Sequence, residues 1–213
     1  MNQDAGKPGL KQREGSAAIV TVQADKGTAG GIIQPAETPI ASEQPSSLIR
    51  IAGVVRESIV DGPGIRFTVF TQGCKHHCPG CHNPQTHDFD GGNEVTADSL
   101  LEQIKKNPLL DGITLSGGEP FEQAVACSEL AQKAHDMKLN VMVYSGYTFE
   151  EIMEGLPEKP GWRDLLHQTD ILVDGRFVLE KRNILLRFRG SENQRLLDVK
   201  KSLLAGRAVM ADL

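Results

Sequence analysis

The chain has 213 residues, enough for one domain with its own core and a tail, and its net charge is −5. The acidic balance does not favour binding to nucleic acid or an anionic membrane, and no apolar run reaches the roughly 20 residues that cross a bilayer. The polar start of the chain lacks the apolar stretch of a secretory signal. We therefore expect a cytoplasmic protein, whose four cysteines stay reduced and suit metal binding better than disulfides.

Residues 1–47 differ in composition from the rest of the chain. They contain no aromatic residue and are rich in Gly, Pro, Ala, Ser and Gln. Such a segment buries too little apolar area to offset the chain entropy lost on folding. We therefore expect a mostly disordered N-terminal tail, followed by one domain over residues 48–213. The apolar run Ala17–Val22 leaves an alternative open, an extra edge hairpin packed on that domain.

From Leu48 onward, strand and helix patterns alternate. Apolar or alternating segments predict strands over Leu48–Val55, Ile65–Thr71, Gly112–Ser116, Asn140–Tyr144 and Asp170–Val173. Helical spacing and start signals predict helices over Ala97–Lys106, with Thr96 as its N-cap, Phe121–Met137 and Phe149–Glu154. This order predicts an α/β fold with parallel strands and outer helices. In such folds the chemistry gathers where the strands end, so the turns after these strands should share one rim.

Three of the four cysteines, Cys74, Cys78 and Cys81, fall within eight residues. Thiolates spaced C-x3-C-x2-C suit an iron–sulfur cluster or zinc. No second cysteine pair follows, so a cluster held here has three ligands from one loop and no obvious fourth. A zinc site remains an alternative, with its fourth ligand from the neighbouring histidines His76, His77 or His82.

The fourth cysteine, Cys127, lies in the middle of a predicted helix. A free cysteine in that setting usually behaves as a small buried hydrophobe. We therefore expect Cys127 to pack in the core and not to bind the metal.

The cysteine loop resembles the signature of the radical S-adenosylmethionine (SAM) superfamily. That resemblance implies that Cys74, Cys78 and Cys81 hold a [4Fe–4S] cluster, whose fourth iron is chelated by SAM. The reduced cluster then cleaves SAM to methionine and a 5′-deoxyadenosyl radical, so the hard chemistry belongs to the cofactors. Downstream, Ser116–Pro120 (Ser-Gly-Gly-Glu-Pro) resembles the superfamily's GGE motif, which holds the SAM amino group.

The resemblance also implies which residues contact SAM. These are Gly80, Cys81, His82 and Gly118, with Glu119 on the amino group and Asp174 as a further polar contact. By local chemistry alone, Asp174 is an ordinary turn residue before Gly175. One position departs from the superfamily pattern: Gly80 stands where many members have an aromatic residue beside the third cysteine.

The segment Ser58–Phe67 (Ser-Ile-Val-Asp-Gly-Pro-Gly-Ile-Arg-Phe) resembles the glycyl-radical-enzyme activases. The short domain, Cys78-Pro-Gly-Cys81 and the stretch Leu186–Gln194 are similar to the activases of the anaerobic (class III) ribonucleoside-triphosphate reductase. The resemblance implies a truncated radical SAM α/β barrel and an oxidoreductase that abstracts hydrogen from a backbone glycine of the reductase. Alternatives are an activase of another glycyl radical enzyme, of the pyruvate formate-lyase type, and a zinc-stabilised binding module.

A stretch rich in cations lies near the C-terminus of this acidic chain. It contains Lys181, Arg182, Arg187, Arg189, Arg195, Lys200 and Lys201. It is either a solvated face or a docking patch for the reductase or for an acidic electron donor such as flavodoxin. Arg66 has two interpretations as well, pairing with a SAM carboxylate or the partner, or a solvated surface arginine.

Overall fold

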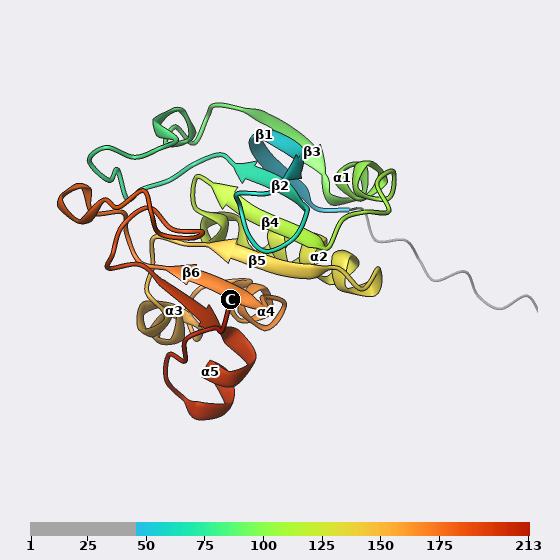
Figure 1. Cartoon of the computed structure of the whole chain (residues 1–213). Helices are drawn as coiled ribbons and strands as arrows, with labels where there is room; N and C mark the ends of the chain where they lie inside the picture. Colours follow the sequence, from blue (N-terminus) through green and yellow to red (C-terminus); the bar gives the residue numbers. More distant parts are fainter. Residues whose placement is uncertain (1–45) are drawn as a thin grey trace, which may run out of the picture. The chain divides into compact units, whose positions relative to one another are not determined.

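The computed structural model describes residues 46–213, which form one seven-stranded sheet with helices (Figure 1). The strands are β1 (Leu48–Ser58), β2 (Arg66–Thr71), β3 (Asn93–Thr96), β4 (Gly112–Gly117), β5 (Asn140–Tyr144), β6 (Ile171–Asp174) and β7 (Arg195–Asp198). The α-helices are α1 (Ala97–Ile104), α2 (Ala124–Asp136), α3 (Phe149–Gly155), α4 (Trp162–His167) and α5 (Val199–Ala205). Short 3-10 helices are η1 (Pro84–Thr86), η2 (Pro120–Gln123) and η3 (Leu179–Lys181). No helix in this part of the chain is long and apolar enough to cross a membrane.

The strand order is β3-β1-β2-β4-β5-β6-β7, and the sheet is mixed. Its centre, β2-β4-β5-β6, is parallel, which confirms the expected α/β class. The expectation of parallel strands is wrong at both edges, where β1, β3 and β7 pair antiparallel. A parallel pair needs a long crossover, usually a helix. The connections from β1 to β2 and from β6 to β7 contain no α-helix, so the strands reverse direction there.

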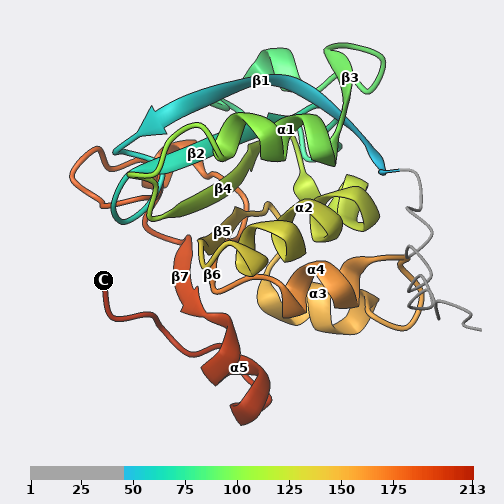
Figure 2. The same ribbon diagram turned by 90° about the vertical axis from the view of Figure 1, so that its right-hand side faces the viewer.

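The two faces of the sheet differ in what covers them. Figures 1 and 2 show α1, α2, α3 and α4 along one face. Side chains alternate along β5, so Val141 and Val143 join the main core under these helices, while Met142 points to the other face. There Met142 packs in a smaller cluster with Ile171, Val173, Leu196, Tyr144 and Phe188. That second face, which we call the open face, is covered by loops, and this leaves space for a site.

Several elements differ from the predictions. The helix expected from Phe121 begins instead as the 3-10 helix η2, whose first amide is bound by the side chain of Glu119. β3, β7, α4 and α5 were not predicted. Short elements of this kind form largely because of the neighbours they pack against, which local patterns do not show. The predicted N-cap is confirmed, since Thr96 Oγ1 accepts from Ser99 N at 3.1 Å.

The expected tail, residues 1–47, lies outside the described residues except for its last two. Ser46 Oγ and Ser47 N donate to the carboxylate of Glu129 on α2, at 3.0 and 2.9 Å. These two bonds hold the start of the described chain on α2.

Arg66 is neither solvated nor directed at a partner, because its side chain is fully buried on the open face of the sheet. Nε donates to Thr114 Oγ1 at 2.7 Å, and the two Nη atoms donate to Asn140, Ile113 and Pro63. Thr114 Oγ1 in turn donates to the carbonyl of Asp61 at 2.8 Å. Burial lowers the pKa of Arg66 to about 10. The guanidinium thus fastens the loop of residues 59–65 to the sheet.

We expect Arg66→Lys to lower the free energy of unfolding by about 2–3 kcal/mol, because an ammonium cannot reach this spread of acceptors and leaves buried oxygens unpaired. Urea unfolding followed by circular dichroism measures the change. Arg56→Lys is the control, since Arg56 is exposed and, within residues 46–213, its side chain donates only to Gln103. An Arg66→Lys protein as stable as the control would contradict this account.

Candidate functional site

The three clustered cysteines lie in the loop that follows β2, at the C-terminal end of the parallel strands. The loop is anchored by backbone bonds to residues just after it, from Gly73 N to Thr86 O at 2.8 Å and from Cys74 N to His87 O at 3.1 Å. A tight turn closes with the bond from Cys81 N to Cys78 O at 3.1 Å. Gly80 in this turn has φ +71°, a left-handed conformation that glycine adopts without strain. This backbone conformation explains why position 80 is a glycine and not an aromatic residue.

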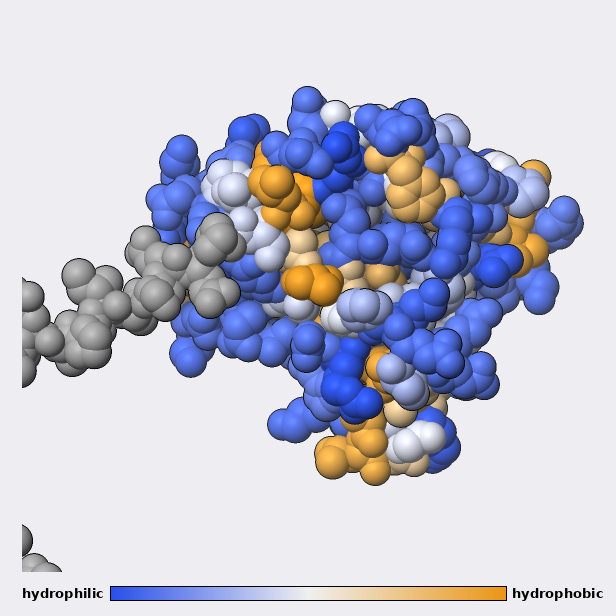
Figure 3. Space-filling model, turned by 180° about the vertical axis from the view of Figure 1, so that it is seen from behind, coloured by the Kyte–Doolittle hydropathy of each residue, from blue (hydrophilic) through white to orange (hydrophobic). Residues whose placement is uncertain are grey.

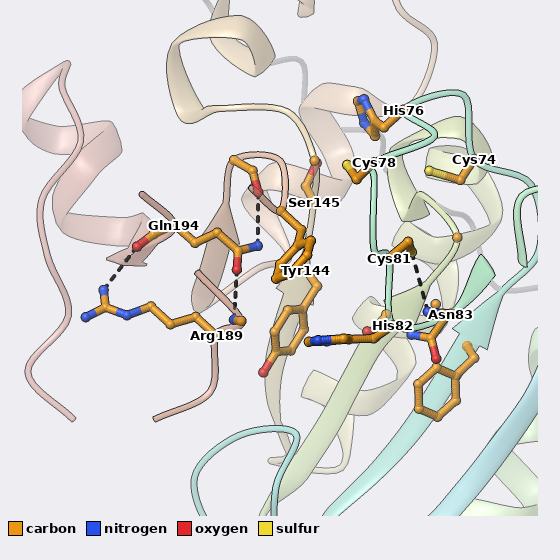
Figure 4. A pocket seen from close by; sticks show the side chains of 18 of the residues that line it. Cys74, His76, Cys78, Cys81, His82, Asn83, Tyr144, Ser145, Arg189 and Gln194 are labelled. Carbon is orange, nitrogen blue, oxygen red and sulfur yellow. Dashed lines mark hydrogen bonds between the residues drawn. The ribbon is translucent and has the colours of Figure 1, made fainter. Parts of the chain in front are cut away.

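All three thiols face one cavity of about 540 Å³ (Figure 4). The cavity is also lined by Val60, Asp61, Phe70, His76, His82, Asn83, His87, Ser116, Gly117, Gly118, Tyr144, Ser145, Gly146, Gly175, Phe177, Leu186, Phe188, Arg189, Gly190 and Gln194. Figure 4 shows the cysteines on one side, Tyr144 and His82 in the middle, and Gln194 and Arg189 on the other side. The guanidinium of Arg189 points away from the cysteines.

The four cysteines fall into two groups. Cys74 is 8% exposed, Cys78 and Cys81 are half-buried, and burial raises the pKa of the Cys74 and Cys78 thiols. Cys127 is fully buried in α2, where burial raises the pKa of its thiol to about 12. Its predicted role as a small core residue is confirmed, and it does not line the cavity.

Glu119 is fully buried and joins the cysteine loop to the ends of β4 and β5. Its Oε1 accepts from Phe121 N at 3.1 Å and Ser145 Oγ at 3.0 Å. Its Oε2 accepts from Gly146 N at 2.8 Å and is 2.9 Å from Nε2 of His76, which lies between two of the cysteines. Two bonds on each oxygen fill the acceptor capacity of a carboxylate. Glu119 is accordingly not among the residues that line the cavity.

Two glycines near Glu119 are required by close packing. A Cβ on Gly146 would meet the His76 ring at 2.3 Å, and one on Gly118 would meet the carbonyl oxygen of Gly73 at 2.5 Å. Gly118 therefore brings the chain after β4 against the start of the cysteine loop at Gly73, and Gly118 N donates to the carbonyl of Thr71, the last residue of β2, at 2.8 Å. The backbone of Gly118 still lies on the cavity wall.

Asp174, at the end of β6, is fully buried and engaged by protein donors. Its carboxylate accepts from Phe149 N at 2.7 Å, at the start of α3, and is paired with Arg195. Arg195 also pairs with Glu150 on α3. Asp174 therefore joins α3 to β7, and the cavity beside it is lined by Gly175 and Phe177 instead.

Of the residues selected from the sequence, the structure brings Cys74, Cys78, Cys81, His82 and Gly118 together on the cavity wall. Aromatic residues on the wall were missed as site residues, among them Phe70, Tyr144, Phe177 and Phe188. The ring of Phe177 lies 5.0 Å from that of His82, so an aromatic pair stands near Gly80 without an aromatic side chain at that position. The sequence does carry a signal for Tyr144: side chains alternate along β5, so with Val141 and Val143 in the core, Tyr144 lies on the opposite face.

Residues 60–197 match the family model described as a 4Fe-4S single cluster domain. Over 144 residues the chain is 34% identical to the anaerobic ribonucleoside-triphosphate reductase-activating protein of Vibrio cholerae. The aligned region covers 64% of this chain and 89% of the relative. The protein of that name from Escherichia coli is 32% identical, with 64% and 90% covered, and that of Enterobacteria phage T4 is 30% identical over 145 residues, with 64% and 86% covered. The chain belongs to this family of activating proteins. The family expected from the sequence motifs is thereby confirmed.

The cavity fits the iron–sulfur cluster that belongs to this family's 4Fe-4S domain. Three thiols face it, and its volume is in the range of cofactor sites. A ring nitrogen of His87, Nε2, is buried beside it with no hydrogen-bond partner among residues 46–213, so the wall presents a polar atom that the protein leaves free. Within the same residues, no three His, Cys, Asp or Glu side chains gather closely enough to hold a single metal ion.

We expect the cysteines of the iron-free protein to differ in alkylation by iodoacetamide. Cys78 and Cys81 should react first and Cys74 more slowly, whereas Cys127 should react only after unfolding, because it is inaccessible and its thiol keeps its proton. Peptide mass spectrometry measures each rate. Labelling of native Cys127 as fast as Cys78 would show that the core position is wrong.

We expect Glu119→Gln to loosen the cysteine loop. The amide replaces one carboxylate oxygen with an NH2 group, which donates hydrogen bonds, whereas each oxygen of Glu119 now accepts from two donors. The free energy of unfolding should fall by about 2–3 kcal/mol, the cost of losing buried bonds to a charged group. Iron retained after gel filtration and the unfolding midpoint are the measurements. Glu102→Gln, on an exposed face of α1, is the control. Equal iron retention and stability in the two variants would disprove the positioning role.

Proposed function

We propose that this protein activates the anaerobic ribonucleoside-triphosphate reductase as a radical SAM enzyme. The observation that supports this best is the donor set: Cys74, Cys78 and Cys81 face one cavity, and the remaining cysteine is in the core. Such a set would leave one iron of a [4Fe–4S] cluster without a protein ligand. When bound, the cluster and SAM supply one-electron cleavage of SAM to methionine and a 5′-deoxyadenosyl radical that takes a hydrogen atom from a backbone glycine of the reductase.

In this proposal the protein's own residues bind and orient the cofactors. The three thiolates hold the cluster, while the backbone of Gly80, Cys81 and Gly118 and the ring of His82 contact SAM. The proposed contact of Glu119 with the SAM amino group requires that the ammonium displace a present donor, such as His76 Nε2. Asp174 has the same requirement with respect to Arg195. If SAM does not displace these donors, Glu119 and Asp174 do not contact it, and their role is to hold the strand ends in place.

We infer that the sheet is a truncated radical SAM barrel. The support is the parallel run β2-β4-β5-β6, the helices on one face, and a cavity on the other face near the strand ends. In the described residues the sheet ends at β3 on one side and at β7 on the other, where residues 209–211 pair with β7, so it does not close on itself. The radical must be shielded from water and oxygen, and in this proposal the glycine-bearing segment of the reductase completes the enclosure.

The test is to mix anaerobic, iron-loaded protein with SAM, a reductant and the reductase, and to record electron paramagnetic resonance spectra. We expect a brown protein that bleaches with dithionite and a glycyl-radical doublet on the reductase. Alanine at Cys74, Cys78 or Cys81 should abolish both signals because a thiolate ligand is lost, whereas Cys127→Ala should keep them. Reduced flavodoxin should replace dithionite as the electron donor.

Other outcomes would select other functions. A radical on a pyruvate formate-lyase type enzyme, with none on the reductase, would identify a different partner. A colourless protein with one bound zinc would identify a zinc-stabilised binding module and reject the radical mechanism.

A further inference from the structure

The cavity opens between two stretches of chain that expose apolar side chains. One is the loop of residues 59–64, where Ile59 and Val60 are 73% and 72% exposed. The other, which we name the mouth loop, is residues 176–189, in the connection from β6 to β7. Its tip residues Ile184 and Leu185 are 83% and 86% exposed, and the next residue, Leu186, lines the cavity together with Val60. The apolar surface is thus continuous from the exposed tip into the site.

The tip of the mouth loop is held in place by the chain itself. Arg182 and Ser191 form an antiparallel bridge, and Asn183 N donates to Gly190 O at 3.2 Å. The side chain of Asn183 accepts from Leu185 N at 3.0 Å. Phe188 adopts a left-handed φ of +56° and packs against the apolar cluster on the open face. These contacts keep Ile184 and Leu185 in solvent although both are apolar, which is typical of an interaction site.

The mouth loop is also strongly basic. Residues 176–189 contain five cationic residues, Arg176, Lys181, Arg182, Arg187 and Arg189, against one carboxylate, Glu180, in a chain of net charge −5. None of these five cations forms an ion pair with any residue between 46 and 213.

The rest of the basic C-terminal stretch is separate. Arg195 and Lys201 have carboxylate partners, and Lys200 and Lys201 lie on α5, which Figure 1 shows away from the mouth loop. From behind, Figure 3 shows a mostly hydrophilic surface with scattered apolar patches, one of them over α5 at the bottom. Among the cations of this basic stretch that have no ion pair within residues 46–213, all but Lys200 therefore lie in the mouth loop.

We propose that the mouth loop is the docking surface for the polypeptide whose glycine is oxidised, and that this polypeptide presents carboxylates and apolar side chains beside that glycine. This inference rests on the proposed function and adds the place and the chemistry of the partner. The target segment must enter the cavity, and the apolar tip leads directly into it. The unpaired cations select an acidic partner and accelerate its approach.

The experiment compares two variants of the mouth loop with two matched variants on α5 or just after it. Arg182→Glu/Arg187→Glu is matched by Lys200→Glu/Arg207→Glu, since all four side chains are exposed and lack ion pairs within residues 46–213. Ile184→Ser/Leu185→Ser is matched by Leu204→Ser, because Leu204 is 83% exposed. Affinity for the purified reductase is measured at low and high salt, and SAM cleavage with dithionite is measured without the reductase.

We expect both mouth-loop variants to weaken reductase binding by about tenfold or more, and the α5 variants by less than about twofold. The loss from charge reversal should shrink at high salt, and the loss from the serine variant should persist. All variants should cleave SAM like the wild type, because they leave the cavity wall intact.

Each other outcome overturns a stated part of the inference. Mouth-loop variants that bind the reductase as tightly as the wild type overturn the docking surface and leave the proposed function intact. If they lose binding to reduced flavodoxin instead, the occupant is the electron donor and the assignment to the target polypeptide is wrong. If the wild type neither binds the reductase nor forms a radical on it, the proposed function fails and the docking inference fails with it.

Discussion

The arrangement of the site depends on one buried carboxylate. Glu119 accepts hydrogen bonds from the backbone at the start of η2, from the turn after β5 and, through His76, from the cysteine loop. A buried charge is tolerated only when its acceptor sites are filled, and here four donors fill them. The same bonds fix where three chain segments meet, so Glu119 helps to hold the loop that carries the thiols. Gly146 is part of this constraint because a side chain there would displace His76.

The sheet has a second constraint, the unequal covering of its faces. Helices close one face with a continuous apolar core, whereas the other is covered by loops held by Arg66 and Phe188. Loops are suited to carrying function on a rigid scaffold. In the proposed function the open face provides a wall for cofactors and an entrance for a partner, and the basic mouth loop lies at that entrance. The core and the proposed reaction therefore occupy opposite faces of one sheet.

Much of the fold follows from patterns between residues close together in the chain. The parallel strands, the cap at Thr96 and the loop of Cys74 to Cys81 follow from short-range patterns, and the structure has them. The edge strands β3 and β7 and the helices α4 and α5 were missed because short elements depend on what they pack against. Glu119 and Asp174 were selected as cofactor contacts, and the structure engages both with donors distant in sequence, such as Ser145 and Arg195.

The sequence by itself determined the chemistry that this protein offers: three thiols at C-x3-C-x2-C spacing, a fourth cysteine in a helix, and an alternating α/β order. These properties depend only on residue type and on spacing along the chain, so they are visible before the chain folds. Only the tertiary structure decided which groups remain free to act. It buried Arg66 among backbone oxygens and filled the acceptor sites of Glu119. It also paired Arg195 with carboxylates, whereas Arg182 and Arg187 have no carboxylate partner within residues 46–213. The physical reason is that hydrogen bonding and ion pairing are settled between residues far apart in the chain, and their distances exist only in the folded protein.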